Sequence, residues 1–236
     1  MVNKMSLNEF SPNSALPAPA ADATAKELFF YEFSKRAFDI LFSLVVLVCG
    51  LPIFIVLAVI IKATSPGPVF YTSKRIGKDG KLFTCWKFRS MFCDAEHRLT
   101  QLLAENPHYR REWKKYFKLK EDPRLTKIGK FLRKTSLDEF PQFWNVLLGD
   151  LSLVGPRPFL PNEMNAIKQV IGKQTQALFS VKPGITGIWQ TSGRSFLTFE
   201  QRILLDLNYL NLRSFLFDLT IIGKTIPMLV HPKGAF

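Results

Sequence analysis

The feature that most constrains this chain is an uncharged apolar run at residues 40–61, ILFSLVVLVCGLPIFIVLAVII. As a continuous helix rising about 1.5 Å per residue, this run would just cross the roughly 30 Å hydrocarbon core of a bilayer. Its length and apolarity argue against a buried core helix of a soluble protein. We therefore predict a membrane segment.

Two features favour a re-entrant segment over a straight crossing. Gly50 and Pro52 interrupt its middle, and a proline removes a helical hydrogen bond and kinks the axis. Lys35, Arg36 and Lys62 place cations at both ends. Because cationic flanks tend to stay on the cytoplasmic side, we favour a helix that enters the bilayer, bends near Pro52 and returns. A straight crossing is the alternative.

The positive charge of the chain is concentrated in one region. The formal net charge is +13, and residues 62–134 hold 19 Lys and Arg against 7 Asp and Glu. This concentration indicates an anionic partner, which could be nucleic acid, an acidic membrane surface or a phosphorylated substrate. The cysteines and histidines show no spacing typical of a zinc site.

Two elements are predicted after the apolar run. The segments VFYTSKRIG and KLFTCWKF flank Asp79-Gly80, a pattern typical of a β-hairpin. After Pro107, a basic helix is predicted to carry an aromatic face formed by Tyr109, Trp113, Tyr116 and Phe117. Such a helix is typical of a membrane interface. Nucleic-acid binding also fits the charge, but the adjacent membrane segment favours anionic lipid.

An adjacent pair of acids, Asp138 and Glu139, is the strongest candidate for chemistry. The pair lies in RKTSLDEFPQFWNVLLGDLSLVGPRP at residues 133–158, with Arg133 and Lys134 before it and Arg157 after it. Carboxylates can hold a metal ion or attack phosphorus, and arginine is suited to phosphate oxygens. The stretch therefore indicates phosphoryl transfer.

Two local structures are compatible with this pair. Ser136 and Glu139 fit a capping box, in which both side chains satisfy amides at a helix start. Alternatively, Pro141 takes the first helical position with Phe140 as the cap, which leaves the acids just outside the helix. In both cases the acids lie near a helix N-terminus, which favours carboxylates and bound phosphate.

The prolines of Gly155-Pro156-Arg157-Pro158 restrict the backbone on both sides of Arg157, so this side chain is predicted to be aimed at a target. A surface turn with a solvated arginine is the alternative. Asp206 and Asp218 are expected to be solvated or paired helix acids rather than ligands. The chain contains no Walker phosphate loop, dinucleotide fingerprint or Asp-x-Asp pair.

Several long motifs occur together and in order. They are KRAFDI before the apolar run, SPGPVFY after it, KFRSM at residues 87–91, DPRLTKIGKFLRKTSLDEFPQFWNVLLGDLSLVGPRP, and VKPGITGIWQTSGRS. With these motifs the chain resembles the bacterial sugar transferases, which are monotopic polyprenyl-phosphate phosphoglycosyl transferases, from about Ser34 to the C-terminus. The chain looks like the short, catalytic-core form of that family.

The resemblance implies transfer of a sugar 1-phosphate from a UDP-sugar to undecaprenyl phosphate, which starts a polysaccharide or glycan. It implies that Asp138 is the nucleophile and that Glu139, with Asp138, holds Mg²⁺. The family's basic motif positions match Lys87, Arg89, Arg133 and Arg157, which would bind phosphate. The last residues, LVHPKGAF, and the segment from Lys182 to Ser195 look closer to hexose-1-phosphate transferases that use galactose or glucose.

The resemblance also implies a location at the cytoplasmic face of the bacterial inner membrane and no nucleic-acid partner. We expect an α+β fold that is mainly helical, with a disordered tail at 1–33, a re-entrant membrane helix at 34–64 and a cytoplasmic catalytic domain at 65–236 containing a small β-hairpin. Two rival hypotheses are a non-catalytic, basic membrane-anchored adaptor and a membrane-associated nucleic-acid binder. Oligomeric state is left open.

Overall fold

A computed structural model describes residues 25–117, 119–193 and 197–230. Most of the predicted tail, Arg194 and Ser195 of the GRS motif and the end of the chain from residue 231 lie outside this range. The helices are α1 (Ala25–Thr64), α2 (Ala95–Glu105), α3 (Pro107–Tyr116), α4 (Lys127–Thr135), α5 (Gln142–Leu148), α6 (Met164–Ile171), α7 (Thr175–Leu178), α8 (Ile188–Ser192), α9 (Phe199–Leu212) and α10 (Phe215–Val230). The strands are β1 (Phe70–Ile76), β2 (Leu82–Phe88), β3 (Ser152–Val154) and β4 (Gly184–Thr186). The fold is mainly helical, as predicted.

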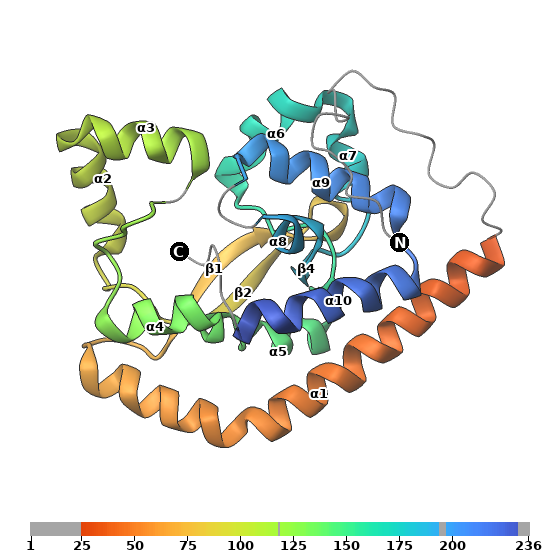
Figure 1. Cartoon of the computed structure of the whole chain (residues 1–236), viewed down its shortest axis with the longest axis horizontal. Coiled ribbons are helices and arrows are strands. Elements are labelled where there is room, and N and C mark those ends of the chain that lie inside the picture. The colour runs from red at the N-terminus through yellow and green to blue at the C-terminus, as the bar shows by residue number, and fades with distance from the viewer. Residues whose placement is uncertain (1–24, 118, 194–196, 231–236) are drawn as a thin grey trace.

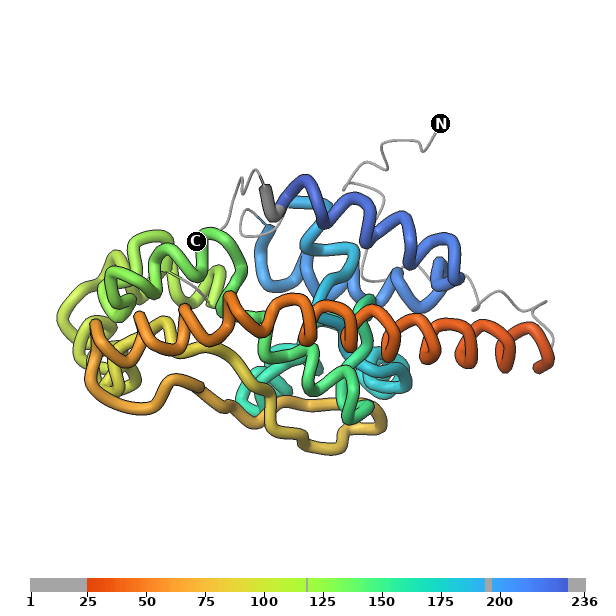
Figure 2. Tube along the Cα trace, turned by 90° about the horizontal axis from the view of Figure 1, so that it is seen from below, coloured from red at the N-terminus to blue at the C-terminus, as the bar shows by residue number. Residues whose placement is uncertain are grey.

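Helix α1 carries the apolar run and contains Pro52 in its interior. It already begins at Ala25, so the predicted boundary between a tail and a helix at residue 33 is wrong. Figure 1 shows the helix bending near its middle, so that both of its ends rise toward the rest of the molecule. Seen from below in Figure 2, it crosses nearly the whole length of the protein. A bend in this helix agrees with the hydrogen bond that Pro52 removes.

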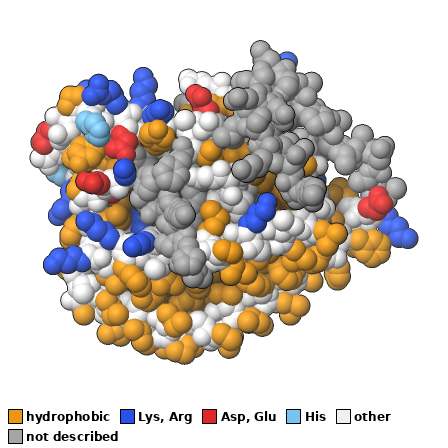
Figure 3. Space-filling view, in the orientation of Figure 1, with side chains coloured by type: hydrophobic (Ala, Val, Ile, Leu, Met, Phe, Trp, Pro, Cys, Tyr) orange, Lys and Arg blue, Asp and Glu red, His pale blue; other side chains and the backbone are white. Residues whose placement is uncertain are grey.

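Many apolar side chains of α1 point away from the protein. Figure 3 shows a hydrophobic band along the edge of the molecule that α1 forms. Leu41, Val48 and Val59 are 63–64% exposed, which excludes the alternative of a buried core helix. Of the described helices, α1 alone is long and apolar enough to cross a membrane. Large exposed apolar side chains also occur on α4, α5 and α10: Phe131, Trp144, Leu148, Leu216 and Ile226.

The β-hairpin forms as the sequence predicts. Strands β1 and β2 pair antiparallel, with Phe70 opposite Phe88 and Tyr71 opposite Lys87. Asp79 and Gly80 both have positive φ, 56° and 76°, which is the backbone that a tight Asp-Gly turn requires. The hairpin fixes where Lys87 stands at the end of β2.

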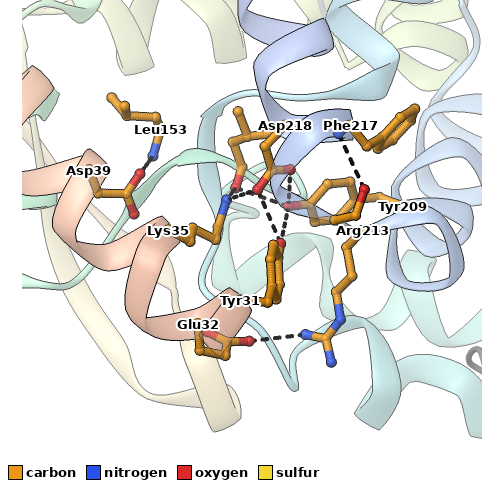
Figure 4. Close-up of polar contacts among 11 residues, drawn as sticks. Tyr31, Glu32, Lys35, Asp39, Leu153, Tyr209, Arg213, Phe217 and Asp218 are labelled. Carbon is orange, nitrogen blue, oxygen red and sulfur yellow. Dashed lines mark hydrogen bonds and ion pairs between the residues drawn. The ribbon is translucent and has the colours of Figure 1, made fainter. Parts of the chain in front are cut away.

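A second sheet was not predicted. Strands β3 and β4 pair parallel, with Ser152 opposite Gly184 and Val154 opposite Thr186. Above them, α8, α9 and α10 form a core cluster with buried Leu153, Trp189 and Ile221. The N-terminal half of α1 is held to this core through Asp218, as described below and drawn in Figure 4.

The α2–α3 pair projects at one end of the molecule (Figure 1). Helix α3 begins at Pro107, as predicted, and two of the four predicted aromatic residues contact other parts of the protein. The ring of Phe117, which follows the helix, lies 4.7 Å from that of Phe199, and the Trp113 ring lies 5.3 Å from the Arg124 guanidinium. Tyr109 and Tyr116 are half-buried, and the contact of this helix with a membrane stays a prediction.

Candidate active site

The local backbone around the acid pair differs from the first of the two predicted structures. Ser136 has a φ of 58° and ends α4, and its side chain makes no capping bond. The predicted capping box between Ser136 and Glu139 is therefore wrong. Asp138 and Glu139 lie in a 3₁₀ turn, η3 (Leu137–Glu139). Helix α5 begins only at Gln142, with Pro141 as its N-cap. The alternative, with Phe140 as the cap and Pro141 at the first helical position, is therefore wrong by one residue, but its expectation that the acids lie just outside the helix is confirmed.

Helix α4 brings a cation to this turn. Thr126 caps the start of α4 by accepting a hydrogen bond from the Gly129 amide at 2.9 Å. A β-carbon on Gly129 would stand 1.8 Å from the Ser90 carbonyl oxygen, so only glycine permits α4 to approach so closely. In the last turn of α4, Arg133 donates to the Ser90 hydroxyl at 3.1 Å, and its Nε lies 3.8 Å from Oδ2 of Asp138.

Asp138 is buried, with 5% of its surface exposed. Burial raises the pKa of its carboxyl to about 6, with the neighbouring Glu139 adding to the rise, while Lys87 and Arg133 oppose it. A carboxylate that is shielded from water but flanked by cations is a stronger nucleophile than a solvated one, provided that it is ionised.

Glu139 is the accessible member of the pair. Its side chain is 38% exposed, and Lys87 donates to its Oε1 at 2.5 Å. Lys87 comes from the end of β2, so this ion pair joins the hairpin to η3. The structure thus brings together four of the predicted site residues, Asp138, Glu139, Lys87 and Arg133. They form a compact group of two acids and two cations.

Arg89 contacts the backbone behind α1. It is 5% exposed, and its terminal nitrogens donate to the carbonyl oxygens of Ser65 at 2.6 Å and Pro66 at 2.8 Å. These carbonyls follow the end of α1, where the backbone has lost its helical partners. Arg89 therefore has a structural role in this conformation, and its contact with phosphate stays a prediction.

Arg157 belongs to a second buried network. Its guanidinium lies 3.8 Å from Glu163 and 5.7 Å from the Trp189 ring, and its amide donates to Oδ2 of Asp206 at 2.8 Å. Asp206 has no exposed surface, and burial raises its pKa to about 8. Of the two states expected for Asp206, solvated or paired, the structure shows the paired one, and the side chain of Arg157 is aimed, as the prolines predicted. The target that it contacts is Glu163.

The acid pair has the donor chemistry that a magnesium ion requires. Mg²⁺ prefers oxygen ligands and is usually bound by one or two carboxylates together with substrate phosphates and water. Asp138 and Glu139 provide such a pair at an accessible edge. Within the described parts of the chain, no three His, Cys, Asp or Glu residues cluster as a complete metal site. The remaining ligands would therefore come from substrate and solvent.

Comparison with known proteins identifies the family. The family described as bacterial sugar transferase matches residues 30–232. The chain belongs to the bacterial sugar transferase family. This match covers α1, the hairpin, the acid pair and both β3 and β4 in one family unit, in agreement with the motifs on which the resemblance rests.

Individual relatives of this sugar transferase are known by name. It is 43% identical over 205 residues to an undecaprenyl-phosphate galactose phosphotransferase of Salmonella typhimurium, covering 86% of this chain and 42% of the relative. It is 38% identical over 197 residues to a UDP-glucose:undecaprenyl-phosphate glucose-1-phosphate transferase of Escherichia coli, covering 81% and 39%. The exopolysaccharide production protein ExoY of Sinorhizobium fredii is 37% identical over 203 residues, covering 86% and 88%. The chain thus spans less than half of the first two relatives and most of the third.

Sequence reasoning missed Ser90, which positions a cation of the acid pair, and it named no partner for Asp206. Ser90 holds Arg133, and its carbonyl also accepts the Thr126 amide at 3.1 Å. Asp206 holds the backbone at Arg157. Ser90 lies inside the KFRSM motif, so its position in that motif was the available signal. For Asp206 the signal was an acid within a helix whose neighbours are apolar.

Proposed function

We propose that this sugar transferase moves a sugar 1-phosphate from a UDP-sugar to undecaprenyl phosphate and releases UMP. The observation that carries the proposal is the buried Asp138 beside Glu139, Lys87 and Arg133. The relatives named for undecaprenyl-phosphate galactose and glucose phosphotransfer support this reaction class. Their names also favour a hexose as the sugar, and the name of the ExoY relative favours a product in exopolysaccharide synthesis.

In this reaction Asp138 acts as the nucleophile. Its carboxylate oxygen attacks the sugar-bearing phosphorus, a new bond forms between that oxygen and phosphorus, and the bond from phosphorus to the bridging oxygen of UMP breaks. UMP leaves with the bridging oxygen and the electron pair. An oxygen of undecaprenyl phosphate then attacks the same phosphorus and displaces Asp138, which returns as a carboxylate. The burial of Asp138 limits competing attack by water on the intermediate.

The cations supply charge compensation. Lys87 and Arg133 flank the acids, where they would contact the diphosphate and favour the ionised form of Asp138. Glu139, with Asp138, would hold Mg²⁺, which neutralises charge on the diphosphate when bound. Arg157 would approach phosphate only by exchanging its contact with Glu163, 3.8 Å away.

The proposed location is the cytoplasmic face of the inner membrane. The bend in α1, its outward apolar side chains and the cations at Lys35, Arg36 and Lys62 support a helix that enters and leaves on one side. In that arrangement the acid pair lies where a soluble UDP-sugar meets a lipid phosphate. The tether of α1 to the catalytic residues runs through Leu57 and Ile61, which pack with Phe88 and Leu132.

The decisive experiment measures UMP release from a panel of UDP-hexoses with Mg²⁺ and undecaprenyl phosphate. The intact protein is compared with Asp138→Asn, which keeps the shape of the side chain. Acceptor-dependent release that the variant loses supports the proposal. In parallel, a donor labelled at the sugar-bearing phosphorus should label the denatured wild-type protein when the acceptor is omitted, and should not label the variant.

The adaptor hypothesis predicts different results. A non-catalytic adaptor releases no UMP from any donor and takes up no label, whereas its binding to anionic vesicles is the same with Asp138 or Asn. Release of UMP without labelling of the protein would instead support the transfer reaction and contradict the covalent intermediate.

A further inference from the structure

A second polar pocket lies between the N-terminal half of α1, the hairpin turn and the β3–β4 sheet. It has a volume of about 80 Å³ and none of its lining residues is Asp138, Glu139 or one of their cationic partners Lys87 and Arg133. Five cations line it: Lys35, Arg36, Lys78, Lys182 and Arg213. Only two acids, Glu32 and Asp39, line it with them. The pocket therefore carries excess positive charge.

Two of the five cations have carboxylate partners, as Figure 4 shows. Lys35 lies 2.6 Å from Oδ2 of Asp218, a buried acid that also accepts hydrogen bonds from the hydroxyls of Tyr31 and Tyr209. Arg213 lies 3.4 Å from Glu32. These pairs hold α1 against α10 and form one wall of the pocket.

The third cation, Arg36, is engaged by backbone. Its guanidinium donates to the carbonyl oxygens of Val146 at 2.6 Å and Leu147 at 2.9 Å, in the last turn of α5. This contact satisfies carbonyls that a helix end leaves without partners. It also fixes the Arg36 charge at the pocket rather than leaving it to move in solvent.

The remaining two cations, Lys78 and Lys182, form no hydrogen bond or ion pair of their side chains with the described residues. The Arg36 Nη2 and the Lys182 Nζ each lie 3.5 Å from the point that a β-carbon on Gly149 would occupy. Two positive groups thus converge beside a glycine that leaves the space open. Burial lowers the pKa of Lys182, and the nearby Arg36 and Lys78 lower it further, against opposing acids Asp39 and Glu32. This excess of positive charge favours a bound anion.

The surroundings indicate what would carry that anion. Arg36 lies four residues before the uncharged run of α1, and Asp39 lies between them. The exposed rings of Phe29 and Phe33, 67% and 64% exposed, lie on the same half of the helix. Aromatic side chains next to lysine and arginine are typical of the headgroup level of a bilayer, and basic pockets at that level bind lipid phosphates.

We propose that this pocket, formed by Arg36, Lys78 and Lys182, is a binding site for the phosphate of an anionic phospholipid headgroup. The site is separate from the acid pair, and it does not depend on the proposed reaction. Its lipid would fasten the N-terminal half of α1, the hairpin turn and the loop before β4 to one another at the membrane surface.

The experiment uses the full chain in detergent and measures the affinity for monomeric short-chain lipids. The probes are dihexanoyl phosphatidylglycerol, dihexanoyl phosphatidylcholine and inorganic phosphate. The double variant Lys78→Gln/Lys182→Gln is compared with the control Lys81→Gln/Lys173→Gln, which removes the same charge from exposed lysines outside the pocket. We expect phosphatidylglycerol to bind best to the wild type, and the pocket variant to bind it about tenfold more weakly or worse.

The other outcomes are equally informative. Equal weakening in both double variants would show general charge attraction and would overturn the site. Inorganic phosphate that binds as tightly as phosphatidylglycerol, and with the same dependence on Lys78 and Lys182, would overturn the lipid as its source and keep the anion pocket. Lys78→Arg/Lys182→Arg should retain binding, which separates loss of charge from loss of folding. Loss of binding in this conservative variant would contradict the proposal.

Discussion

Two buried aspartates of this protein have raised pKa values in very different surroundings. Asp206 has no exposed surface and uses Oδ2 to hold the Arg157 amide. Asp138 is almost as buried, but it adjoins the accessible Glu139 and the cations Lys87 and Arg133. Burial and a raised pKa are therefore shared by both. What separates them is the degree of access, because Glu139 beside Asp138 is 38% exposed, whereas the side chain of Arg157, the partner of Asp206, is 18% exposed.

A raised carboxyl pKa does not by itself identify a catalytic acid. A carboxyl bonded to a backbone amide inside a helix bundle stabilises one loop conformation. A carboxyl beside an accessible acid and flanking cations can meet a substrate. Exchange of each aspartate for asparagine removes the titratable carboxyl and keeps its shape, so the same substitution tests both interpretations.

The largest effect is expected for turnover. Asp138→Asn should reduce UMP release by about 10³-fold or more, because it removes the nucleophile. Asp206→Asn should retain activity to within about tenfold, because the asparagine oxygen can still accept the Arg157 amide. Steady-state kinetics on both variants check this. Equal losses of turnover in the two variants would contradict the assignment of Asp138, and not Asp206, to the reaction.

Arg89 and Arg133 are expected to differ in their contributions to the free energy of unfolding. Arg89→Ala should lower the free energy of unfolding by about 3 kcal/mol, since it leaves the Ser65 and Pro66 carbonyls without their buried donor. Arg133→Ala, at a side chain that is 36% exposed, should cost less than about 1 kcal/mol and act mainly on turnover. Denaturation in detergent, followed by circular dichroism, measures both. A stable but inactive Arg89→Ala protein would instead support the predicted contact of Arg89 with phosphate.

Lys87 tests whether the cations of the acid pair act on substrate. Lys87→Gln should lower turnover by about 10²-fold, because it removes a positive charge next to the reacting phosphorus. Lys74→Gln is the matched control on the same hairpin, where Lys74 donates only to Thr84 among the described residues, at 2.9 Å. Similar rates for the two variants would place Lys87 outside the chemistry.

The smallest effect concerns pH. The pKa of Asp206 is about 8 in the folded protein and about 4 in an unfolded chain. The folded state therefore holds a proton that the unfolded state has lost, and the resulting stability, present in full below pH 4, disappears as pH rises toward 8. We expect the free energy of unfolding to fall by about 2 kcal/mol between about pH 6.5 and pH 8, and Asp206→Asn to reduce this fall. An identical pH dependence in wild type and variant would contradict the assignment.

The sequence by itself determined the features that local pattern controls. The apolar run with Pro52, the hairpin at Asp79-Gly80 and the start of α3 at Pro107 follow from hydrophobic length, turn chemistry and the proline ring, all of which act over a few residues. The proximity of Asp138 to Arg133 is local as well, because both lie within two turns of chain. The resemblance to the family then suggested the roles of these two residues, Asp138 as the nucleophile and Arg133 in binding phosphate.

Only the tertiary structure decided which charges serve the site and which serve the fold. Arg89 and Lys87 lie two residues apart in the sequence. Arg89 nevertheless donates to a backbone carbonyl that follows α1, whereas Lys87 donates to the carboxylate of Glu139. The parallel pairing of β3 with β4 and the contact of Arg157 with Asp206 join segments that no local pattern connects. Such contacts depend on how distant elements pack, and the burial that they create sets the pKa of each acid.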